Sequence, residues 1–218
     1  MISHKHKCIF IHIVKTGGTS VEQLLIKNQL WHKPQKHWTA SRAKKGYSEW
    51  WDAYYKFSIV RNPYDRLYSA YKFFMYPCSF KIFIKYRPLP PCTARRKPQL
   101  GGSILLKNKY SEESCRAYCT RYACGDDPIF KPCIDSITSP EGCVLIDRIL
   151  RFENLNAEWF DLANDIDLPT KLPHVIPFGN GTRNKRSNYI KHYDDETREA
   201  VAKDFAKDIE YFGYKFEQ

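Results

Sequence analysis

The sequence contains no run of about eighteen apolar residues, the length that a helix needs to cross a membrane. Its first apolar stretch, Cys8 to Val14, is short and is followed directly by Lys15. Such a stretch fits neither a membrane span nor the core of a signal peptide. From these absences we expect a chain that is soluble as given, without an anchor or a targeting segment.

Two common binding patterns are also missing. The spacing G-x-x-x-x-G-K-[ST] does not occur, which removes the main support for an ordinary ATPase or GTPase. The chain has eight cysteines, but the paired C-x2-C spacing of common zinc modules is absent. Zinc therefore stays open as one explanation of the cysteines, beside disulfides and unpaired structural thiols.

The cysteines are clustered. Cys8 alone lies in the first apolar stretch, and the other seven lie in or beside a basic segment that contains several prolines. The seven are Cys78, Cys92, Cys115, Cys119, Cys124, Cys133 and Cys143. Because such a segment packs a poor core unaided, we predict an irregular, Cys-rich insert at about 76–143 that is held by disulfides.

The compartment is left open by these features. Disulfides, and the glycosylation sequon at 180–182, favour the Golgi or another oxidising lumen. The missing targeting segment gives no support to that interpretation.

Positive charge dominates the composition. The formal net charge is +11, so we expect anionic partners. Between Lys72 and Tyr122, eleven Lys and Arg residues accompany only two acids, Glu112 and Glu113. This part of the chain is a candidate surface for an anionic glycan, with surface charge for solubility as the alternative. Charge alone does not choose among nucleotide, nucleic acid, lipid and polysaccharide.

Short β-branched runs alternate with helical patterns along the rest of the chain. Strands are expected at 8–14, 56–60 and 144–152, and helices after residue 19, through 50–51, from 63 to 74, at 154–165 and from 194 or 195 to 212. Residues 32–47 are polar and basic and are expected to form a loop. This alternation predicts an α/β fold, a single domain over 1–218 with a central parallel sheet flanked by helices.

A glycine-containing turn follows the first predicted strand and leads into a helix. It consists of Lys15, Thr16, Gly17, Gly18, Thr19 and Ser20. Glycines let the backbone approach an anion, and the amide groups and dipole at a helix start favour negative charge. The turn therefore predicts a phosphate-binding loop. Within it, Thr19 and Glu22 have the spacing of a capping box, which explains Glu22 without catalysis.

A second group of polar residues surrounds the end of the next predicted strand. Arg61 ends that strand, and Ser69 lies about two turns into the helix that Pro63 begins. Ligands bind at the carboxyl edge of parallel sheets, and an Arg with a hydroxyl makes a good phosphate clamp. We predict that Arg61 and Ser69 bind phosphate together, whereas Arg66 is structural or ion-paired.

Together these two stretches resemble the PAPS-dependent sulfotransferases, which use 3'-phosphoadenosine-5'-phosphosulfate (PAPS). The resemblance is to the carbohydrate branch with the heparan and uronyl 2-O- and chondroitin enzymes. It extends over residues 8–74 and 144–216, through Arg151-Phe152-Glu153-Asn154-Leu155, Leu172-Pro173-His174 and the ending 207–214. It departs at Val14, where the family usually has Pro, and at Ile176, where an Asn is frequent.

The resemblance implies a nucleotide-binding, P-loop-like fold and a site for PAPS as co-substrate. It implies that residues 15–20 hold the 5'-phosphosulfate and that Arg61 and Ser69 hold the 3'-phosphate. It also suggests that Arg186, in a region that folds over the cofactor in similar enzymes, contacts phosphate, with a solvated basic loop as the alternative. The partner it implies is a hydroxyl-bearing acceptor, with no nucleic acid.

Sulfuryl transfer needs a base for the acceptor hydroxyl and a cation for the leaving phosphate. His titrates near neutral pH, and the 2-O-sulfotransferase-like enzymes place a catalytic His in the loop that resembles residues 36–40, so His37 is the predicted base. His32 and His174 are rivals, and His12 is expected to be a packed strand residue. Lys15 is the predicted catalytic cation. No metal is required for this step.

Two other functions stay open on the sequence alone. One is an ATP-dependent phosphotransferase, because a phosphate loop does not by itself distinguish nucleotides. The other is a non-catalytic module that binds a polyanion through the basic insert. Neither the acceptor nor the oligomeric state is indicated.

Overall fold

The computed structural model describes residues 1–26, 34–74, 79–87, 127–173 and 189–216. The chain groups into two compact units, Met1–Asn62 with Pro132–Gly181 and Pro63–Lys131 with Thr182–Gln218. Most of the insert predicted at 76–143 lies outside the described residues, and a single domain stays a prediction. Within the described ranges, no helix has the length and apolar character needed to span a membrane.

The first unit is built on a four-stranded sheet in the order β1-β2-β3-β4. β2 (Cys8–Ile11), β3 (Tyr55–Val60) and β4 (Arg148–Arg151) are parallel, and β1 (Ile2–Ser3) joins β2 antiparallel at the edge. The predicted α/β fold with a central parallel sheet is thus confirmed. The antiparallel edge was not predicted, because a two-residue strand leaves no periodic signal.

The register of the sheet brings polar residues to one edge. Ile11 aligns with Ser58, and Val60 aligns with Arg151. The Ser58 hydroxyl also donates a 2.7 Å hydrogen bond to the Ile11 carbonyl. Residues that follow β2 and β3 therefore emerge together at the carboxyl edge, where ligands of parallel sheets bind.

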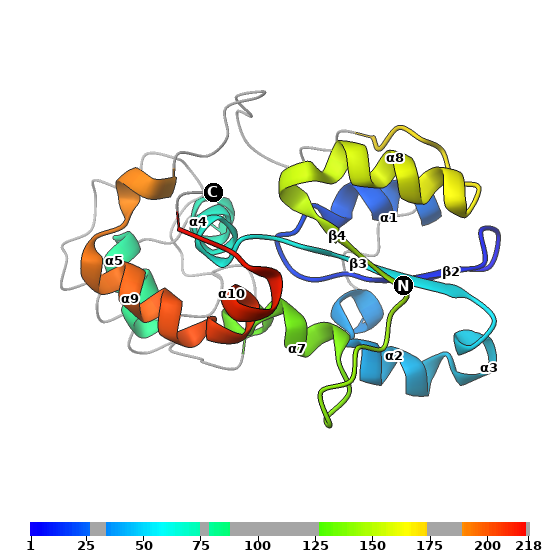
Figure 1. Ribbon diagram of the computed structural model, residues 1–218, viewed down its shortest axis with the longest axis horizontal. Helices are drawn as coiled ribbons and strands as arrows, with labels where there is room; N and C mark the ends of the chain where they lie inside the picture. The colour runs from blue at the N-terminus through cyan, green and yellow to red at the C-terminus, as the bar shows by residue number, and fades with distance from the viewer. Residues whose placement is uncertain (27–33, 75–78, 88–126, 174–188, 217–218) are drawn as a thin grey trace, which may run out of the picture. The chain divides into compact units, whose positions relative to one another are not determined.

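Helices cover both faces of this sheet (Figure 1). α1 (Gly18–Ile26) and α8 (Leu155–Asp165) lie on one face, and α2 (Ala40–Gly46), α3 (Ser48–Trp51) and α7 (Cys133–Ile137) lie on the other. The core against α1 and α8 contains Phe10, Phe57, Leu150, Val21 and Trp159. The intervening strand residues Ile9 and Ile11 are buried as well, which is the double burial expected of a parallel sheet.

Two predictions for this unit were wrong in part. The loop expected at 32–47 contains α2, because Thr39 caps the helix by accepting the Arg42 amide and the small residues Ala40 and Ala43 bury its inner face. The strand expected at 144–152 is limited to β4, since Val144 is exposed and makes only an isolated bridge with Thr138.

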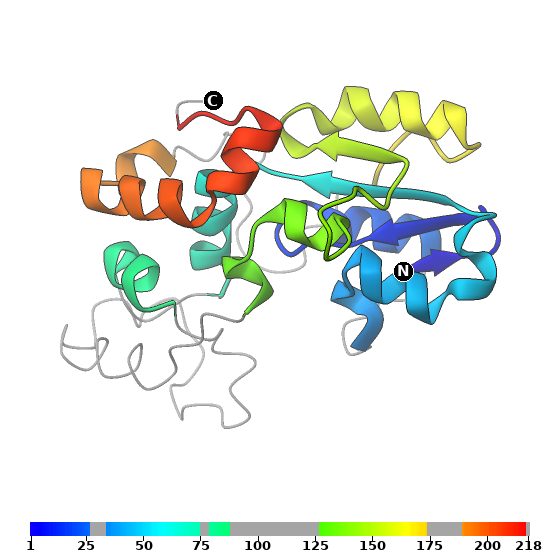
Figure 2. The same ribbon diagram turned by 60° about the horizontal axis from the view of Figure 1, so that its bottom comes forward.

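The second unit is helical (Figure 2), and its core contains many aromatic side chains. It consists of α4 (Pro63–Phe74), α5 (Phe80–Tyr86), α9 (Asp195–Asp204) and α10 (Ala206–Phe212), with short 3-10 turns at Pro128–Phe130 and Tyr189–His192. Phe83 packs against Tyr71 and Phe130 at ring-centroid distances of 5.6 and 5.3 Å. The Pro63 start of α4 is confirmed.

The ends of the last predicted helix are confirmed, but its middle is not continuous. Asp194 and Thr197 form a capping box, and Gly213 ends the segment in the left-handed conformation. Between them the helix breaks at Phe205, whose side chain is buried. A buried aromatic residue at the break lets α9 and α10 point in different directions while both stay packed.

Arg66 has the structural role predicted for it. Its guanidinium is fully buried in the second unit and donates to the carbonyls of Ile129, at 2.8 Å, and of Lys131. It also lies over the Phe205 ring at 5.4 Å. Arg66 thus connects α4 to the segment at 128–131 and to the end of α9.

Three cysteines are described, Cys8, Cys133 and Cys143, each with a thiol side chain. Burial raises the pKa of the Cys8 thiol to about 12, so this residue is an inert core group. The other five cysteines, which carry most of the predicted disulfide framework, lie outside the described residues, and their pairing stays a prediction.

Candidate active site

The loop between β2 and α1 has the backbone that the predicted phosphate loop requires. Lys15 has φ of +65° and Gly17 has φ of +89°, so two residues with left-handed φ lie in the loop before α1 begins at Gly18. The Thr16 side chain is buried and donates a 2.9 Å hydrogen bond to the Ile13 carbonyl. Thr16 therefore stabilises the turn with its hydroxyl. Thr19 and Ser20 follow in the first turn of α1 and are half-buried.

Each glycine of the loop is required by a different neighbour. A Cβ atom on Gly17 would lie 3.0 Å from the Phe152 ring, and one on Gly18 would lie 2.2 Å from the His12 ring. Gly17 also has a φ that side chains disfavour. The two glycines let the loop lie close against Phe152 and His12.

Lys15 and Arg61 come together at the carboxyl ends of β2 and β3. Arg61 Nη1 donates to the backbone carbonyl of Lys15 at 3.1 Å, and its guanidinium lies 4.0 Å from the Phe152 ring centroid. Arg61 is buried. Burial and, next, the charge of Arg61 lower the pKa of Lys15 to about 7. Two cations that are partly removed from water at a helix start form a setting that an anion would stabilise.

The segment that begins with β4 contacts Arg61 and the end of β3. Phe152 packs under Arg61, and the Glu153 carboxylate accepts the backbone N–H of Asn62 at 2.7 Å. Glu158, in the first turn of α8, accepts the N–H of Arg151 at 2.6 Å. The motif at 151–155 is thus a structural support for the end of β3. Phe152 was missed as a site residue because a lone aromatic residue gives no functional signal in sequence.

A buried polar cluster adjoins the loop. His12 Nδ1 lies 2.9 Å from Glu22 Oε1, and Lys36 Nζ donates to Glu22 Oε2 at 3.0 Å. His12 is 5% and Glu22 is 3% exposed. Burial lowers the pKa of His12, so the imidazole is neutral and donates from Nδ1 to the carboxylate. The pKa of Glu22 is lowered because its bonds to His12 and Lys36 outweigh the effect of burial.

The capping box predicted for Thr19 and Glu22 is wrong. α1 begins at Gly18, so Thr19 lies within the helix, and the Glu22 carboxylate is engaged by His12 and Lys36. His12 is packed as predicted, but it also belongs to this polar cluster. Local spacing suggested the cap, whereas Lys36 lies fourteen residues away in sequence.

His37, the predicted base, lies beside the same cluster. It ends the 3-10 turn η1 (Pro34–His37), and its Nδ1 is 2.9 Å from the His12 carbonyl, with ring centroids 4.7 Å apart. A carbonyl oxygen accepts only, so Nδ1 carries the proton and Nε2 is the nitrogen that can take one. Although the residue is largely exposed, burial of the ring and then the influence of His12 lower its pKa to about 4.

The structure does not test the positions of some predicted site residues relative to Lys15 and Arg61. Ser69 lies on α4 in the second unit, half-buried, and its pairing with Arg61 stays a prediction. Arg186 lies outside the described residues, as do the rival bases His32 and His174. In the part of the chain that the structure covers, no three His, Cys, Asp or Glu side chains are grouped as a metal site.

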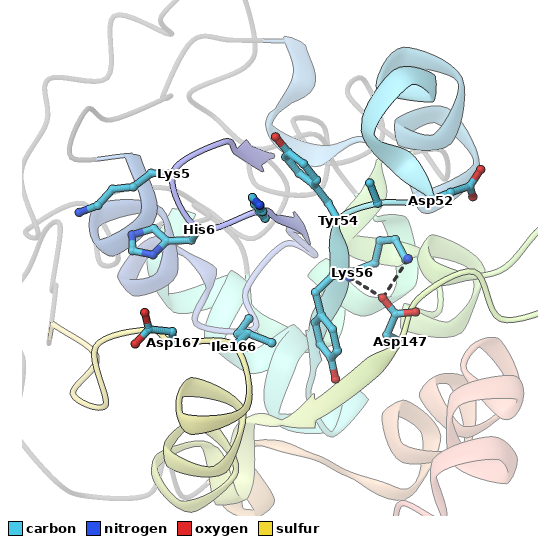
Figure 3. A pocket seen from close by; sticks show the side chains of 11 residues that line it. Lys5, His6, Asp52, Tyr54, Lys56, Asp147, Ile166 and Asp167 are labelled. Atoms are coloured by element: carbon cyan, nitrogen blue, oxygen red, sulfur yellow. Dashed lines mark hydrogen bonds and ion pairs between the residues drawn. The ribbon is translucent and has the colours of Figure 1, made fainter.

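A hollow of about 770 Å³ opens at the opposite edge of the sheet (Figure 3). Its lining comes from the amino ends of β2 and β3, from the residue before β4 and from the end of α8, and it includes Lys5, Tyr54, Lys56 and Ile166. The Lys56 ammonium is paired with Asp147 at 3.0 Å. The hollow mixes lysines with aspartates and lies at the amino ends of the strands, away from the loop at 15–20.

Comparison with known proteins gives one match. A family model described as "Sulfotransferase family" matches residues 1–215, almost the entire chain. No curated protein and no solved structure matches.

Proposed function

This chain belongs to the sulfotransferase family, and on that premise we propose that it moves the sulfuryl group of PAPS to a hydroxyl group of a carbohydrate acceptor. The observation that carries the choice of PAPS is the juxtaposition of Lys15 with Arg61 at the start of α1. Two neighbouring cations suit a nucleotide with anionic groups at both its 5' and its 3' position, and the missing Walker pattern gives ATP no matching support.

Lys15 and the loop backbone are the proposed contacts of the 5'-phosphosulfate. Residues 16–20 supply amide groups at the start of α1, and Gly17 and Gly18 keep that surface open to a close approach. Arg61, together with Ser69, is the proposed clamp of the 3'-phosphate. Arg186 is proposed as a further phosphate contact.

His37 is the proposed general base. Its Nε2 takes the proton of the acceptor hydroxyl while the hydroxyl oxygen forms a bond to sulfur. The bond from sulfur to the bridging phosphate oxygen breaks, and adenosine 3',5'-bisphosphate leaves with that electron pair. The Lys15 ammonium stabilises the negative charge that develops on this oxygen. The support is that His37 is neutral, with Nδ1 occupied by the His12 carbonyl.

A carbohydrate acceptor is proposed from two properties of the sequence. One is the resemblance to enzymes that sulfate heparan, uronyl and chondroitin chains. The other is the concentration of positive charge between residues 72 and 122, which suits an acidic glycan. The Golgi or another oxidising lumen is the compartment that the cysteine cluster and this resemblance favour for such a reaction.

Two measurements test the proposed function. Transfer of labelled sulfate from PAPS should be seen with at least one member of a panel of uronic-acid and galactosamine glycans. Isothermal titration should show adenosine 3',5'-bisphosphate binding more tightly than ATP. Preference for ATP would favour a phosphotransferase, and glycan binding without turnover would favour a non-catalytic module. Either result contradicts the proposal.

A further inference from the structure

Glu22 receives two contacts from different parts of the first unit. One carboxylate oxygen is 2.9 Å from His12 Nδ1, at the end of β2, and the other is 3.0 Å from Lys36 Nζ, in η1. Both distances are those of good hydrogen bonds. Glu22 itself is fixed on α1, the helix that the phosphate loop begins. One side chain thus joins three elements.

The contacts form a closed circuit that includes His37. Lys36 precedes His37 in η1, and His37 Nδ1 returns to the His12 carbonyl at 2.9 Å. The His12 ring in turn lies against Gly18, where a Cβ atom would clash with it. The circuit therefore attaches the turn that carries His37 to the first residue of α1.

This circuit is held by charge in a place with little water. The Glu22 side chain is 3% exposed and that of Lys36 is 11% exposed. A carboxylate buried to this degree depends on its partners, because an unpaired buried charge is strongly unfavourable. Glu22, Lys36 and His12 are therefore expected to keep one arrangement, and a base gains most from such constraint.

We infer that Glu22 is a positioning residue that, through Lys36 and His12, fixes the His37 ring next to the phosphate loop. The role of the His37 ring as a base rests on the proposed function. The inference that its position is fixed does not depend on that function. Glu22 touches no reacting atom in this scheme. Its contribution is the geometry of the base, which can be worth as much as a direct contact, since a displacement of about 1 Å can cost roughly a hundredfold in rate.

The residues of the circuit affect the pKa of His37, so a titration of the His37 ring can test whether they are in place. Burial lowers the pKa of His37 most, and His12 and Lys36 lower it further, whereas the hydrogen bond to the His12 carbonyl and the Glu22 carboxylate raise it. Loss of Lys36 removes one of the positive charges that lower this pKa. As long as the hydrogen bond from His37 Nδ1 to the His12 carbonyl is kept, the pKa of His37 should therefore move upward.

Lys36→Met is the principal test, with Lys36→Arg as rescue and Lys44→Met, at an exposed position on α2, as the matched control. The His37 ring signal, identified among the seven histidines by its loss in His37→Ala, is titrated by NMR. We expect its pKa to rise in Lys36→Met and to return in Lys36→Arg. Turnover should fall roughly tenfold to a hundredfold in Lys36→Met, with unchanged affinity for adenosine 3',5'-bisphosphate.

Glu22→Gln supplies a second, independent test, with its fold checked by circular dichroism. It keeps an acceptor for Lys36 but loses the charge, and we expect the same fall in turnover with nucleotide affinity retained. A His37 signal that titrates as in the wild type in Lys36→Met overturns the inference. If the wild-type chain transfers no sulfate, the proposed function fails, yet the NMR titration still decides whether Glu22 and Lys36 fix the ring.

Discussion

Arg61 donates a hydrogen bond of 3.1 Å to the backbone carbonyl of Lys15, which joins the ends of two parallel strands at the start of a helix. The bond fixes the left-handed conformation of Lys15 and brings a second positive charge to the loop. Anion binding is therefore expected to depend on both residues. Lys15 contributes its charge, and Arg61 contributes its charge and also holds the loop in place.

Replacement of Lys15 by Met should weaken the binding of adenosine 3',5'-bisphosphate and reduce turnover. The pKa of Lys15 is lowered to about 7, so at pH 7.5 much of the unliganded protein carries a neutral amine. A bound phosphate raises that pKa again, and binding should take up protons. Isothermal titration in buffers of different ionisation enthalpy measures this uptake, which Lys15→Met should abolish while Lys45→Met keeps it. Equal proton uptake in Lys15→Met would contradict the assignment.

Gly17→Ala and Gly142→Ala separate backbone strain from close packing. Both glycines have φ of +89°, but a Cβ atom on Gly17 meets the Phe152 ring at 3.0 Å, whereas one on Gly142 meets nothing within 4 Å. Gly142→Ala should cost about 1 kcal/mol of unfolding free energy. Gly17→Ala should cost more and should also weaken nucleotide binding. Urea denaturation and titration calorimetry measure the two effects, and equal losses would show that Phe152 does not constrain the loop.

If His37 is the general base, His37→Ala should reduce turnover by roughly 10²- to 10⁴-fold. Nucleotide binding should stay intact. Because the pKa of His37 is lowered to about 4, the base form persists as pH falls. The acid limb of kcat/KM should therefore lie well below pH 6.5, the value for an ordinary histidine. On the alkaline side kcat/KM should fall as Lys15, with its pKa of about 7, loses its proton.

His6→Ala serves as the control for this histidine, because His6 lines the hollow at the far edge of the sheet. Its pH profile should match that of the wild type. Full activity in His37→Ala, measured as sulfate transfer, would remove His37 from the mechanism.

Arg66→Met should destabilise the second unit without a direct effect on the chemistry of the first. The substitution leaves the carbonyls of Ile129 and Lys131 without their buried donor, and each lost partner costs about 1–3 kcal/mol. Guanidinium denaturation measures the loss, with Lys203→Met, on the exposed side of α9, as the neutral control. An unchanged midpoint for Arg66→Met would show that the buried guanidinium does not stabilise the unit.

Much of the fold was predictable because it depends on local patterns. The apolar runs gave β2 and β3 within a few residues, and Pro63, Asp194 and Gly213 marked helix ends correctly. α2 was missed because its basic residues hide the two alanines that it buries. The juxtaposition of Lys15 and Arg61 followed from a simple rule, since residues after adjacent parallel strands meet at one edge.

The polar cluster could not be predicted in the same way. The spacing of Thr19 and Glu22 fits a cap, and local rules do not reveal that Lys36 and His12 compete for that carboxylate. The carboxylate binds His12 and Lys36 because the tertiary structure buries these side chains together. The roles of Ser69 and Arg186 in binding phosphate stay predictions for other reasons, because Ser69 belongs to the second unit and Arg186 lies outside the described residues.

The position of the His37 ring, open to water on one side and close to Lys36 and His12 on the other, bears on how the protein prepares for the next cycle. If His37 is the base, the imidazolium that it forms with the acceptor proton is acidic, because burial and the nearby Lys36 disfavour its positive charge. Because His37 is an exposed residue, its proton can pass directly to bulk solvent. Regeneration of the starting state then needs no relay of side chains, and the departure of the nucleotide, not of the proton, is expected to limit the cycle.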